Sequence, residues 1–172
     1  MSLDLIAGIL FLGTIVERLF ELVVSKRNAQ WSLSRGGVEV GGEHYHWMVV
    51  MHTVFLMSMV AEFLVFGAGV SAELRYAAIA VAIICQFMRW WIIHTLGHQW
   101  NTRVIVVSGM ERVRRGPYRF LNHPNYVVVA LETVALPLIF GAWRTAIIFS
   151  FLNAWMMRVR IGVENQALKA LR

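Results

Sequence analysis

Four long apolar tracts constrain the fold of this chain more than any other feature. They cover roughly residues 3–24, 46–70, 76–97 and 125–157. The first three are each about 20–25 residues long, which is the length of a helix that crosses a bilayer. Hydrophobic residues make up 58% of the sequence and charged residues 15%, whereas soluble domains average about 45–50% and about 25%. We therefore expect an all-α integral membrane protein.

The fourth tract is too long for one ordinary transmembrane helix. Pro137 and Gly141 lie near its middle, and both residue types interrupt helices. We interpret the tract as a helical hairpin with arms near 125–139 and 142–161, which makes about five transmembrane helices. The alternative is four helices, the last of them long and kinked at Pro137.

The distribution of positive charge favours five helices. Lysines and arginines gather between the first two tracts, between the third and fourth, and at the C-terminal end: Lys26, Arg27, Arg35; Arg103, Arg112, Arg114, Arg115, Arg119; Arg158, Arg160, Lys169, Arg172. Lysine and arginine accumulate in cytoplasmic loops. Five helices with the N-terminus outside place all three groups in the cytoplasm and leave only Arg75 and Arg144 outside. The net charge of +6 is thus explained by membrane orientation, and we expect no nucleic-acid partner.

Ionisable residues also lie inside the expected spans: Glu17, Arg18, Glu21, Glu62, Arg89 and Glu132. Such groups are costly at membrane depth and usually face a bundle interior or a cavity. They could form ion pairs between helices, with Arg89 as the candidate cation for Glu17 and Glu21, or line a substrate pocket. Both interpretations stay open.

Histidine, cysteine and tryptophan give weaker signals. His94 and His98 have the i, i+4 spacing of two metal ligands on one helix face, but no dense histidine motif accompanies them, and we expect no metal. The single Cys85 excludes an intrachain disulfide. Trp90, Trp91 and Trp100 are typical of an interfacial aromatic belt.

The stretch "RRGPYRFLNHPNYVVVALE" places turn residues directly before an apolar helix. Pro124 pushes His123 out of helical geometry and suits the first helical turn, so Asn122 or His123 should lie near the N-cap. The free N–H groups there can receive a carboxylate, and two tyrosines offer aromatic faces. An amphipathic membrane-surface segment with interfacial tyrosines is the alternative.

Within that stretch, "GPYRFLNHPNY" resembles the Gly-x-Tyr … Arg-His-Pro-x-Tyr motif of the isoprenylcysteine carboxyl methyltransferase family. These are small integral membrane enzymes that use S-adenosylmethionine. "RIGVEN" resembles a second family motif, in which an arginine precedes a glutamate by four residues after the last span. The resemblance covers roughly residues 97–171. Two residues depart from it: Asn122 stands where the family has an arginine, and Asn165 where it has a second glutamate.

The resemblance implies a set of site residues at the cytoplasmic membrane surface. S-adenosylmethionine would be bound by Arg103, Met110, Glu111, Arg112, Val113, Tyr118, His123, Pro124, Asn125, Tyr126 and Glu164. Arg160 would face the substrate and act in catalysis. Glu132 is a second candidate for substrate binding. Together with His98, Glu132 is also a candidate general base, which a phenolic acceptor would need and a carboxylate would not.

"NHPNY" and "LGHQWNTRVIVVSG" are more similar to the bacterial branch of the family, whose members include methyltransferases of alkylpyrones and alkylresorcinols. We expect residues 1–172 to form one membrane methyltransferase domain of a bacterial inner membrane, with its C-terminus cytoplasmic. It would methylate a carboxylate or hydroxyl oxygen of a lipid-like acceptor of prenylcysteine, alkylpyrone or alkylresorcinol type. The alternatives are a non-enzymatic small membrane protein and a sterol-reductase-like oxidoreductase. The oligomeric state stays open.

Overall fold

A computed structural model describes residues 2–170 of the chain, and it describes the side chains of all of these except residues 43, 44 and 168–170. The predicted cytoplasmic cations Lys169 and Arg172 therefore lie outside the described side chains. The elements are α1 (Leu3–Leu33), β1 (Val38–Val40), α2 (Gly42–Phe66), α3 (Ala72–Leu96), η1 (Gly97–Gln99), β2 (Val104–Val106), η2 (Gly116–Arg119), α4 (Pro124–Phe140) and α5 (Trp143–Ala170).

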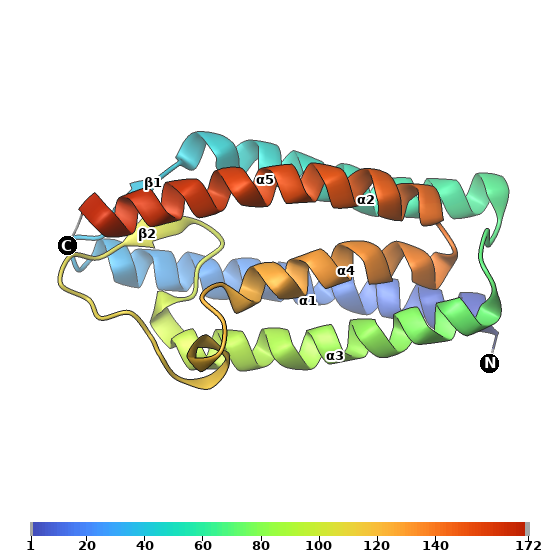
Figure 1. Cartoon of the computed structure of the whole chain (residues 1–172), viewed down its shortest axis with the longest axis horizontal. Helices are drawn as coiled ribbons and strands as arrows, with labels where there is room; N and C mark the ends of the chain where they lie inside the picture. Colours follow the sequence, from blue (N-terminus) through green and yellow to red (C-terminus); the bar gives the residue numbers. More distant parts are fainter. Residues whose placement is uncertain (1, 171–172) are drawn as a thin grey trace.

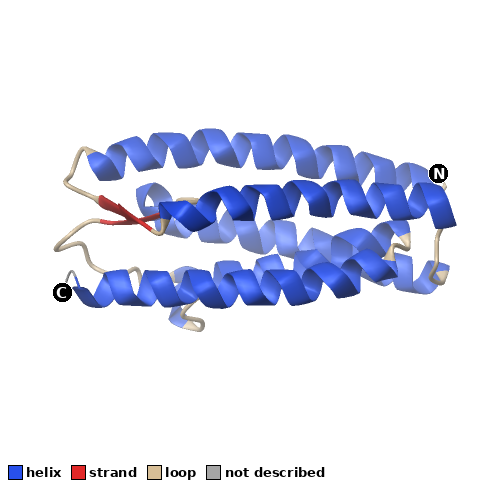
Figure 2. Cartoon of the chain, turned by 90° about the horizontal axis from the view of Figure 1, so that it is seen from above, coloured by secondary structure: helices blue, strands red, loops and turns tan. Residues whose placement is uncertain are grey.

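The five long helices run side by side along the molecule, and α1 begins at the opposite end from that at which α5 ends (Figures 1 and 2). The predicted hairpin is confirmed. α4 ends at Phe140, Gly141 adopts φ 78° in the left-handed region, and α5 begins at Trp143. A Cβ at Gly141 would lie 2.8 Å from the Cα atom of Ala68, so this tight turn requires glycine. Pro137 lies within α4 rather than at its end.

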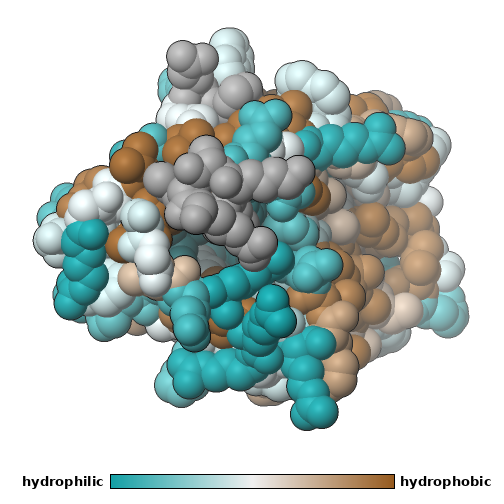
Figure 3. Space-filling model, turned by 60° about the vertical axis from the view of Figure 1, so that its left-hand side comes forward, coloured by the Kyte–Doolittle hydropathy of each residue, from teal (hydrophilic) through white to brown (hydrophobic). Residues whose placement is uncertain are grey.

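The predicted class of integral membrane protein is also confirmed. Among the described residues, three stretches are long and apolar enough to cross a membrane: Tyr45–Phe66, Ala72–Gln99 and Trp143–Ala167. α4 is apolar but only 17 residues long, and α1 carries several charged residues. That α1 and α4 also cross the bilayer stays a prediction. Figure 3 shows hydrophobic side chains along the sides of the bundle and hydrophilic ones at the end where α3 finishes.

The glycines of the segment "RGGVEVGG" (residues 35–42) are typical of a flexible loop, but the segment is partly a strand. β1 pairs with β2 in an antiparallel register that sets Val38 opposite Val106 and Val40 opposite Val104. The β-branched valines of this segment suit a pleated, half-buried ribbon. The ribbon lies at the end of the bundle where α5 finishes (Figure 1).

A cluster of five charged residues connects α1, α3 and α4 inside the bundle. The guanidinium of Arg89 donates through Nε to Oε1 of Glu132 at 3.2 Å and through Nη2 to Oε2 of the same carboxylate. Arg89 Nε also lies 3.6 Å from Glu21 Oε1. Arg18 Nη1 donates to Glu21 Oε2 at 2.8 Å, and its Nη2 lies 3.5 Å from Glu17 Oε2. Of the two interpretations of these residues, the structure favours ion pairing between helices.

Glu62, the remaining ionisable residue of the spans, caps α5 from α2. Its carboxylate accepts hydrogen bonds from the backbone N–H groups of Arg144 at 3.0 Å and Thr145 at 2.7 Å, and from the Thr145 hydroxyl at 2.7 Å. The first N–H groups of a helix have no partner within it. Glu62 therefore fixes where α5 starts and, through α5, the position of Arg160 and Glu164 at the other end.

Replacing Arg89 with methionine should destabilise the bundle. The substitution keeps an unbranched apolar stem but removes the guanidinium, so Glu21 and Glu132 stay buried with less compensating charge, and breaking a buried ion pair in this way costs about 3–5 kcal/mol. Thermal unfolding of the purified protein in detergent measures the effect. The double variant Arg89→Met/Glu132→Met should recover part of the loss, and Arg158→Met, at an exposed position of α5, serves as the control. An Arg89→Met variant as stable as wild type would contradict the role of the cluster.

Candidate functional site

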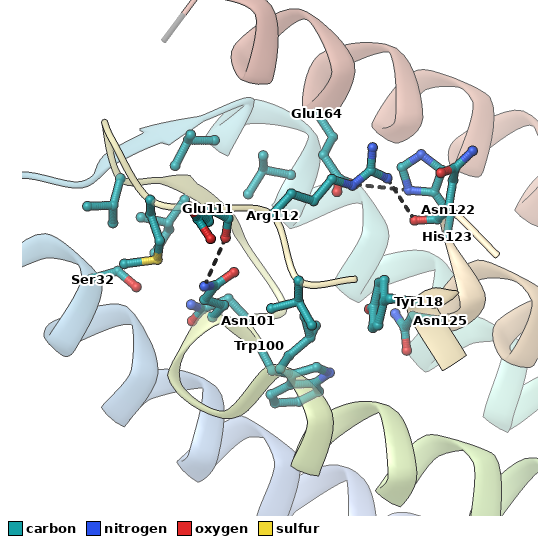
Figure 4. Close-up of a pocket in the computed structure, with 18 of the residues that line it drawn as sticks. Ser32, Trp100, Asn101, Glu111, Arg112, Tyr118, Asn122, His123, Asn125 and Glu164 are labelled. Atoms are coloured by element: carbon teal, nitrogen blue, oxygen red, sulfur yellow. Dashed lines mark hydrogen bonds and ion pairs between the residues drawn. The ribbon is translucent and has the colours of Figure 1, made fainter. Parts of the chain in front are cut away.

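A cavity of about 1090 Å³ opens at the end of the bundle where α3 finishes. Its walls are β2, the loop that follows β2, η2, the first turn of α4 and the last turns of α5 (Figure 4). Small-molecule sites commonly measure about 300–1,000 Å³, so the cavity can take a molecule of cofactor size. Of these walls, all except β2 carry residues of the two motifs or of the arginine-rich connection that leads into the first motif.

The first turn of α4 brings the two motifs together. His123 is the N-cap, with φ −136° and ψ 63°, and Pro124 begins the helix, as the sequence predicts. One turn on, the hydroxyl of Tyr126 donates a 2.8 Å hydrogen bond to Oε2 of Glu164 on α5. The Nδ1 atom of His123 lies 3.9 Å from the same oxygen. Residues separated by about 40 positions in the sequence thus meet at one carboxylate.

Tyr118 is held against α3 by the turn that precedes it. Gly116 has φ +56°, and a Cβ there would lie 2.6 Å from Thr95 Oγ1, so glycine lets the chain approach α3 closely. Pro117 is buried, and Tyr118 is partly buried beside it. Burial, and secondarily the negative charge of Glu164, raises the pKa of the Tyr118 phenol above its ordinary value. Its hydroxyl is therefore protonated at neutral pH and available as a donor.

The loop from Met110 to Val113 forms the outer wall of the cavity. Arg112 donates through Nη2 to the backbone carbonyl of Asn122 at 3.0 Å, which ties this loop to the entrance of α4 (Figure 4). Gln99 donates to the backbone carbonyl of Glu111 at 3.4 Å. At Asn122, where the resemblance leads us to expect an arginine, the guanidinium of Arg112 lies beside the backbone instead.

Arg160 lies at the boundary between the large cavity and a second one of about 30 Å³ beside α2. Its Nη2 donates to the carbonyl of Thr102, and its Nη1 lies 2.8 Å from the sulfur of Met48 on α2. Its Nε is buried and has no hydrogen-bond partner among the described residues. Arg103, also shared by both cavities, pairs with Glu39 at 3.1 Å.

All but one of the residues predicted to hold the cofactor line the large cavity, as does Arg160. The exception is Pro124, which is buried under the helix entrance. Glu132 lies in the charge cluster instead. His98 stacks on Trp31 with ring centroids 4.9 Å apart. Among the described residues, no group of three or more histidines, cysteines or carboxylates could hold a metal ion.

Several wall residues that lie before Met110 were not predicted from the sequence. Trp100 was assigned to an interfacial belt, but its side chain is only 4% exposed and lines the cavity. The Trp100 side chain packs against the end of α3 because η1 turns the chain inward there. Asn101, residues 104–107 and Ser32 of α1 also line the cavity. They could have been found only by knowing that β2 pairs with β1.

Comparison with known proteins identifies the family. The model of the isoprenylcysteine carboxyl methyltransferase (ICMT) family matches residues 78–170. The chain belongs to this family. It is also 39% identical over 156 residues to a protein of Bacillus subtilis (strain 168) named "Uncharacterized protein YpbQ", which covers 90% of this chain and 92% of the relative. No solved structure matches the chain.

Membership of this family makes the chain a membrane methyltransferase, and family members generally use S-adenosylmethionine. This outcome argues against both the non-enzymatic protein and the sterol-reductase-like oxidoreductase. The matched range begins within α3, so α1 and α2 lie outside it. What α1 and α2 contribute to the site is given by their contacts with the residues around the cavity.

α1 fixes the wall of the cavity through Asn28. The side-chain amide of Asn28 donates to the backbone carbonyl of Trp100 at 2.7 Å and to that of Gly97 at 3.1 Å. One turn away, Ser25 exchanges a 2.8 Å hydrogen bond with the hydroxyl of Thr102. The bond to Trp100 satisfies a carbonyl group at the end of η1, and the Gly97 carbonyl accepts from Asn28 in addition to the N–H of Trp100. These contacts hold the segment that leads into β2.

Replacing Asn28 with alanine should loosen residues 98–107 without unfolding the bundle. Each lost hydrogen bond contributes about 0.5–1.5 kcal/mol, so amide hydrogen exchange in this segment should accelerate roughly five- to a hundred-fold. Hydrogen exchange followed by mass spectrometry measures it. The control is Ser34→Ala, because the Ser34 hydroxyl bonds only within its own helix, to the Trp31 carbonyl at 2.9 Å. Equal protection in Asn28→Ala and wild type would show that Asn28 does not hold the wall.

Proposed function

We propose that this chain is an S-adenosylmethionine-dependent O-methyltransferase that binds its cofactor in the large cavity. Residues 1–172 would act as one domain of a bacterial inner membrane, with the cavity at the cytoplasmic surface. The main support for the proposal is the carboxylate of Glu164 on the cavity wall, which accepts a hydrogen bond from Tyr126 and lies beside His123. Family membership alone gives a methyltransferase; this geometry supports where and how it would bind the cofactor.

The polar groups of the cavity fit such a cofactor. The side-chain oxygens of Asn101 and Asn125 are buried and have no hydrogen-bond partner among the described residues, and both residues line the cavity. Buried polar atoms are rarely left unpaired, so they suit the amino and hydroxyl donors of a nucleoside. Glu164 offers a carboxylate for a further donor or a cation, and Tyr118 and Tyr126 offer aromatic faces.

S-adenosylmethionine supplies an electrophilic methyl group on a sulfonium sulfur, which an acceptor oxygen takes by in-line displacement. The residues of the chain have to align the two reactants, and orientation of this kind can contribute about 7–11 kcal/mol to lowering the barrier. Arg160 is well placed for this, because it lies one helical turn before Glu164 and borders both cavities. Its guanidinium can pair with an anionic oxygen and hold it in position.

The structure favours an acceptor that needs no general base. Glu132 is bound in the charge cluster, and the His98 ring is stacked on Trp31. Neither of the two predicted base candidates borders the cavity. A carboxylate, as in a prenylcysteine, or an acidic hydroxypyrone is already anionic near neutral pH, whereas a phenol with an ordinary pKa near 10 is not. We therefore propose an acidic lipid-like acceptor and place the alkylresorcinol type second.

Replacing Glu164 with glutamine should weaken S-adenosylmethionine binding roughly ten- to a hundred-fold. The substitution removes the charge that strengthens its hydrogen bonds, each worth about 1.5–3 kcal/mol. Isothermal titration of the protein in detergent measures the dissociation constant. Tyr126→Phe, which removes the hydroxyl that orients Glu164, should give a smaller loss. Glu73→Gln, at the far end of α3, is the control. Unchanged affinity in a folded Glu164→Gln protein would remove Glu164 from the cofactor site.

Replacing Arg160 with alanine should lower turnover sharply and leave the dissociation constant of S-adenosylmethionine nearly unchanged. The reason is that Arg160 is proposed to hold the acceptor oxygen rather than the cofactor. Steady-state methylation of acidic acceptors with tails of different length measures kcat and KM. Shortening the tail should raise KM instead, because each buried CH₂ contributes about 0.8 kcal/mol. Arg158→Ala, at an exposed position of the same helix, is the control. If Arg160→Ala instead lost cofactor binding but kept its turnover at saturating cofactor, Arg160 would belong to the cofactor site and Glu164 to the acceptor site.

A further inference from the structure

The segment Arg114–Leu121 has two faces. Its inner face, with Arg114, Arg115 and Tyr118, borders the cavity. Its outer face presents Arg119 and two apolar side chains, Phe120, 76% exposed, and Leu121, 43% exposed. The outer face has no part in the cofactor site. We call it the interfacial face, made of Arg119, Phe120 and Leu121, with the exposed Arg114 and Arg115 beside it at the rim of the cavity.

The fold holds this face in one position. η2 packs on the end of α3, where Gly116 lies against Thr95 and Trp91. The backbone N–H groups of Phe120 and Leu121 both donate to the carbonyl of Pro117 at 3.1 Å. The two apolar side chains are thus presented by an ordered turn whose proline is buried. Figure 1 shows the gold segment before α4 lying beside the end of α3.

The depth of the face matches the boundary of the bilayer. Trp91 lies five residues before the end of α3, which is roughly 7.5 Å along the helix axis. Trp90 and Trp91 are 41% and 49% exposed, as expected of an aromatic belt at the membrane interface. Phe120 and Leu121 lie on a turn packed at this level, so a water-exposed position for them is unfavourable. Contact with lipid removes that cost.

The charge of the face selects the kind of lipid. Within the described residues, no carboxylate forms a salt bridge with Arg114, Arg115 or Arg119. Between Arg103 and Leu131 the sequence contains a single acidic residue, Glu111. Arg119 also lies over the ring of Phe120, with 5.9 Å between its Cζ and the ring centroid. Arginines beside an interfacial aromatic ring are complementary to anionic headgroups.

We propose that the interfacial face is a binding surface for anionic phospholipid, with Phe120 and Leu121 inserted among the lipids and Arg119, helped by the neighbouring Arg114 and Arg115, on their headgroups. Arg114 and Arg115 border the cavity and could serve a bound ligand there. Arg119 and Phe120 do not border the cavity, so this surface is distinct from the cofactor site. The proposal is independent of methyl transfer, since it concerns only the contact of this face with the leaflet.

An environment-sensitive fluorophore attached at Phe120→Cys tests the proposal. The natural Cys85 is buried, and wild type treated with the same reagent gives the background. The labelled protein is placed in lipid nanodiscs of phosphatidylcholine with increasing fractions of phosphatidylglycerol, in about 0.1 M salt. We expect the emission to shift to the blue as phosphatidylglycerol increases, and the shift to shrink in about 1 M salt, where charges are screened.

Adding Arg119→Gln should raise the phosphatidylglycerol fraction needed for half of the shift about five-fold, which is the effect expected of one arginine near an anionic surface. Arg158→Gln on α5 is the matched control and should leave the titration unchanged. The same emission wavelength in neutral and in anionic discs would overturn the proposal. This holds both if the emission shows the label in lipid in the two kinds of disc and if it shows the label in water in both. A shift that ignores Arg119→Gln would overturn it as well.

Discussion

The ion pairs among Arg89, Glu132 and Glu21 are the constraint on which the rest of the bundle depends. In water such pairs contribute little, but in a bundle surrounded by lipid an uncompensated charge is costly. Arg89 can satisfy both carboxylates only if α1, α3 and α4 have one relative register. Arg18 adds a second cation from α1, which brings Glu17 into the same cluster. The cluster thus specifies how helices with largely uniform apolar surfaces pack together.

The cavity follows from this register. Once α3 and α4 are fixed, η1 and η2 must turn inward at the same end. Asn28 then bonds to the carbonyl group at the end of η1, and Thr95 packs against the first residue of η2. α5 is set separately, because Glu62 caps its far end. Its last turns then bring Glu164 within hydrogen-bond distance of Tyr126. In the proposed orientation, the polar site would lie at the boundary between bilayer and cytosol, where a water-soluble cofactor and a lipid-like acceptor can meet.

Much of this arrangement could be predicted from the sequence. The features that could not be predicted share a physical cause, which is that they depend on contacts between distant segments. The apolar tracts and the pair Pro137–Gly141 predicted the helices and the hairpin, because length and helix-breaking residues act locally. The resemblance of the motif around His123 and Tyr126 predicted their proximity to Glu164. The β1–β2 ribbon was missed because pairing of two three-residue strands across about 65 positions leaves no local signal. Trp100 was misplaced for a related reason: its burial depends on the turn at η1, not on its neighbours.

We propose that methyl groups pass from S-adenosylmethionine to a lipid-like acceptor at the end of the bundle that carries the cavity. The most direct measurement uses sealed bacterial membrane vesicles containing the protein and methyl-labelled S-adenosylmethionine added to the outside. We expect label in the lipid extract of inverted vesicles, whose cytoplasmic surface faces outward, and little label in right-side-out vesicles. We also expect vesicles with Arg160→Ala to incorporate far less label. Equal labelling in both orientations, or none above vesicles that lack the protein when an acidic lipid acceptor is supplied, would contradict it.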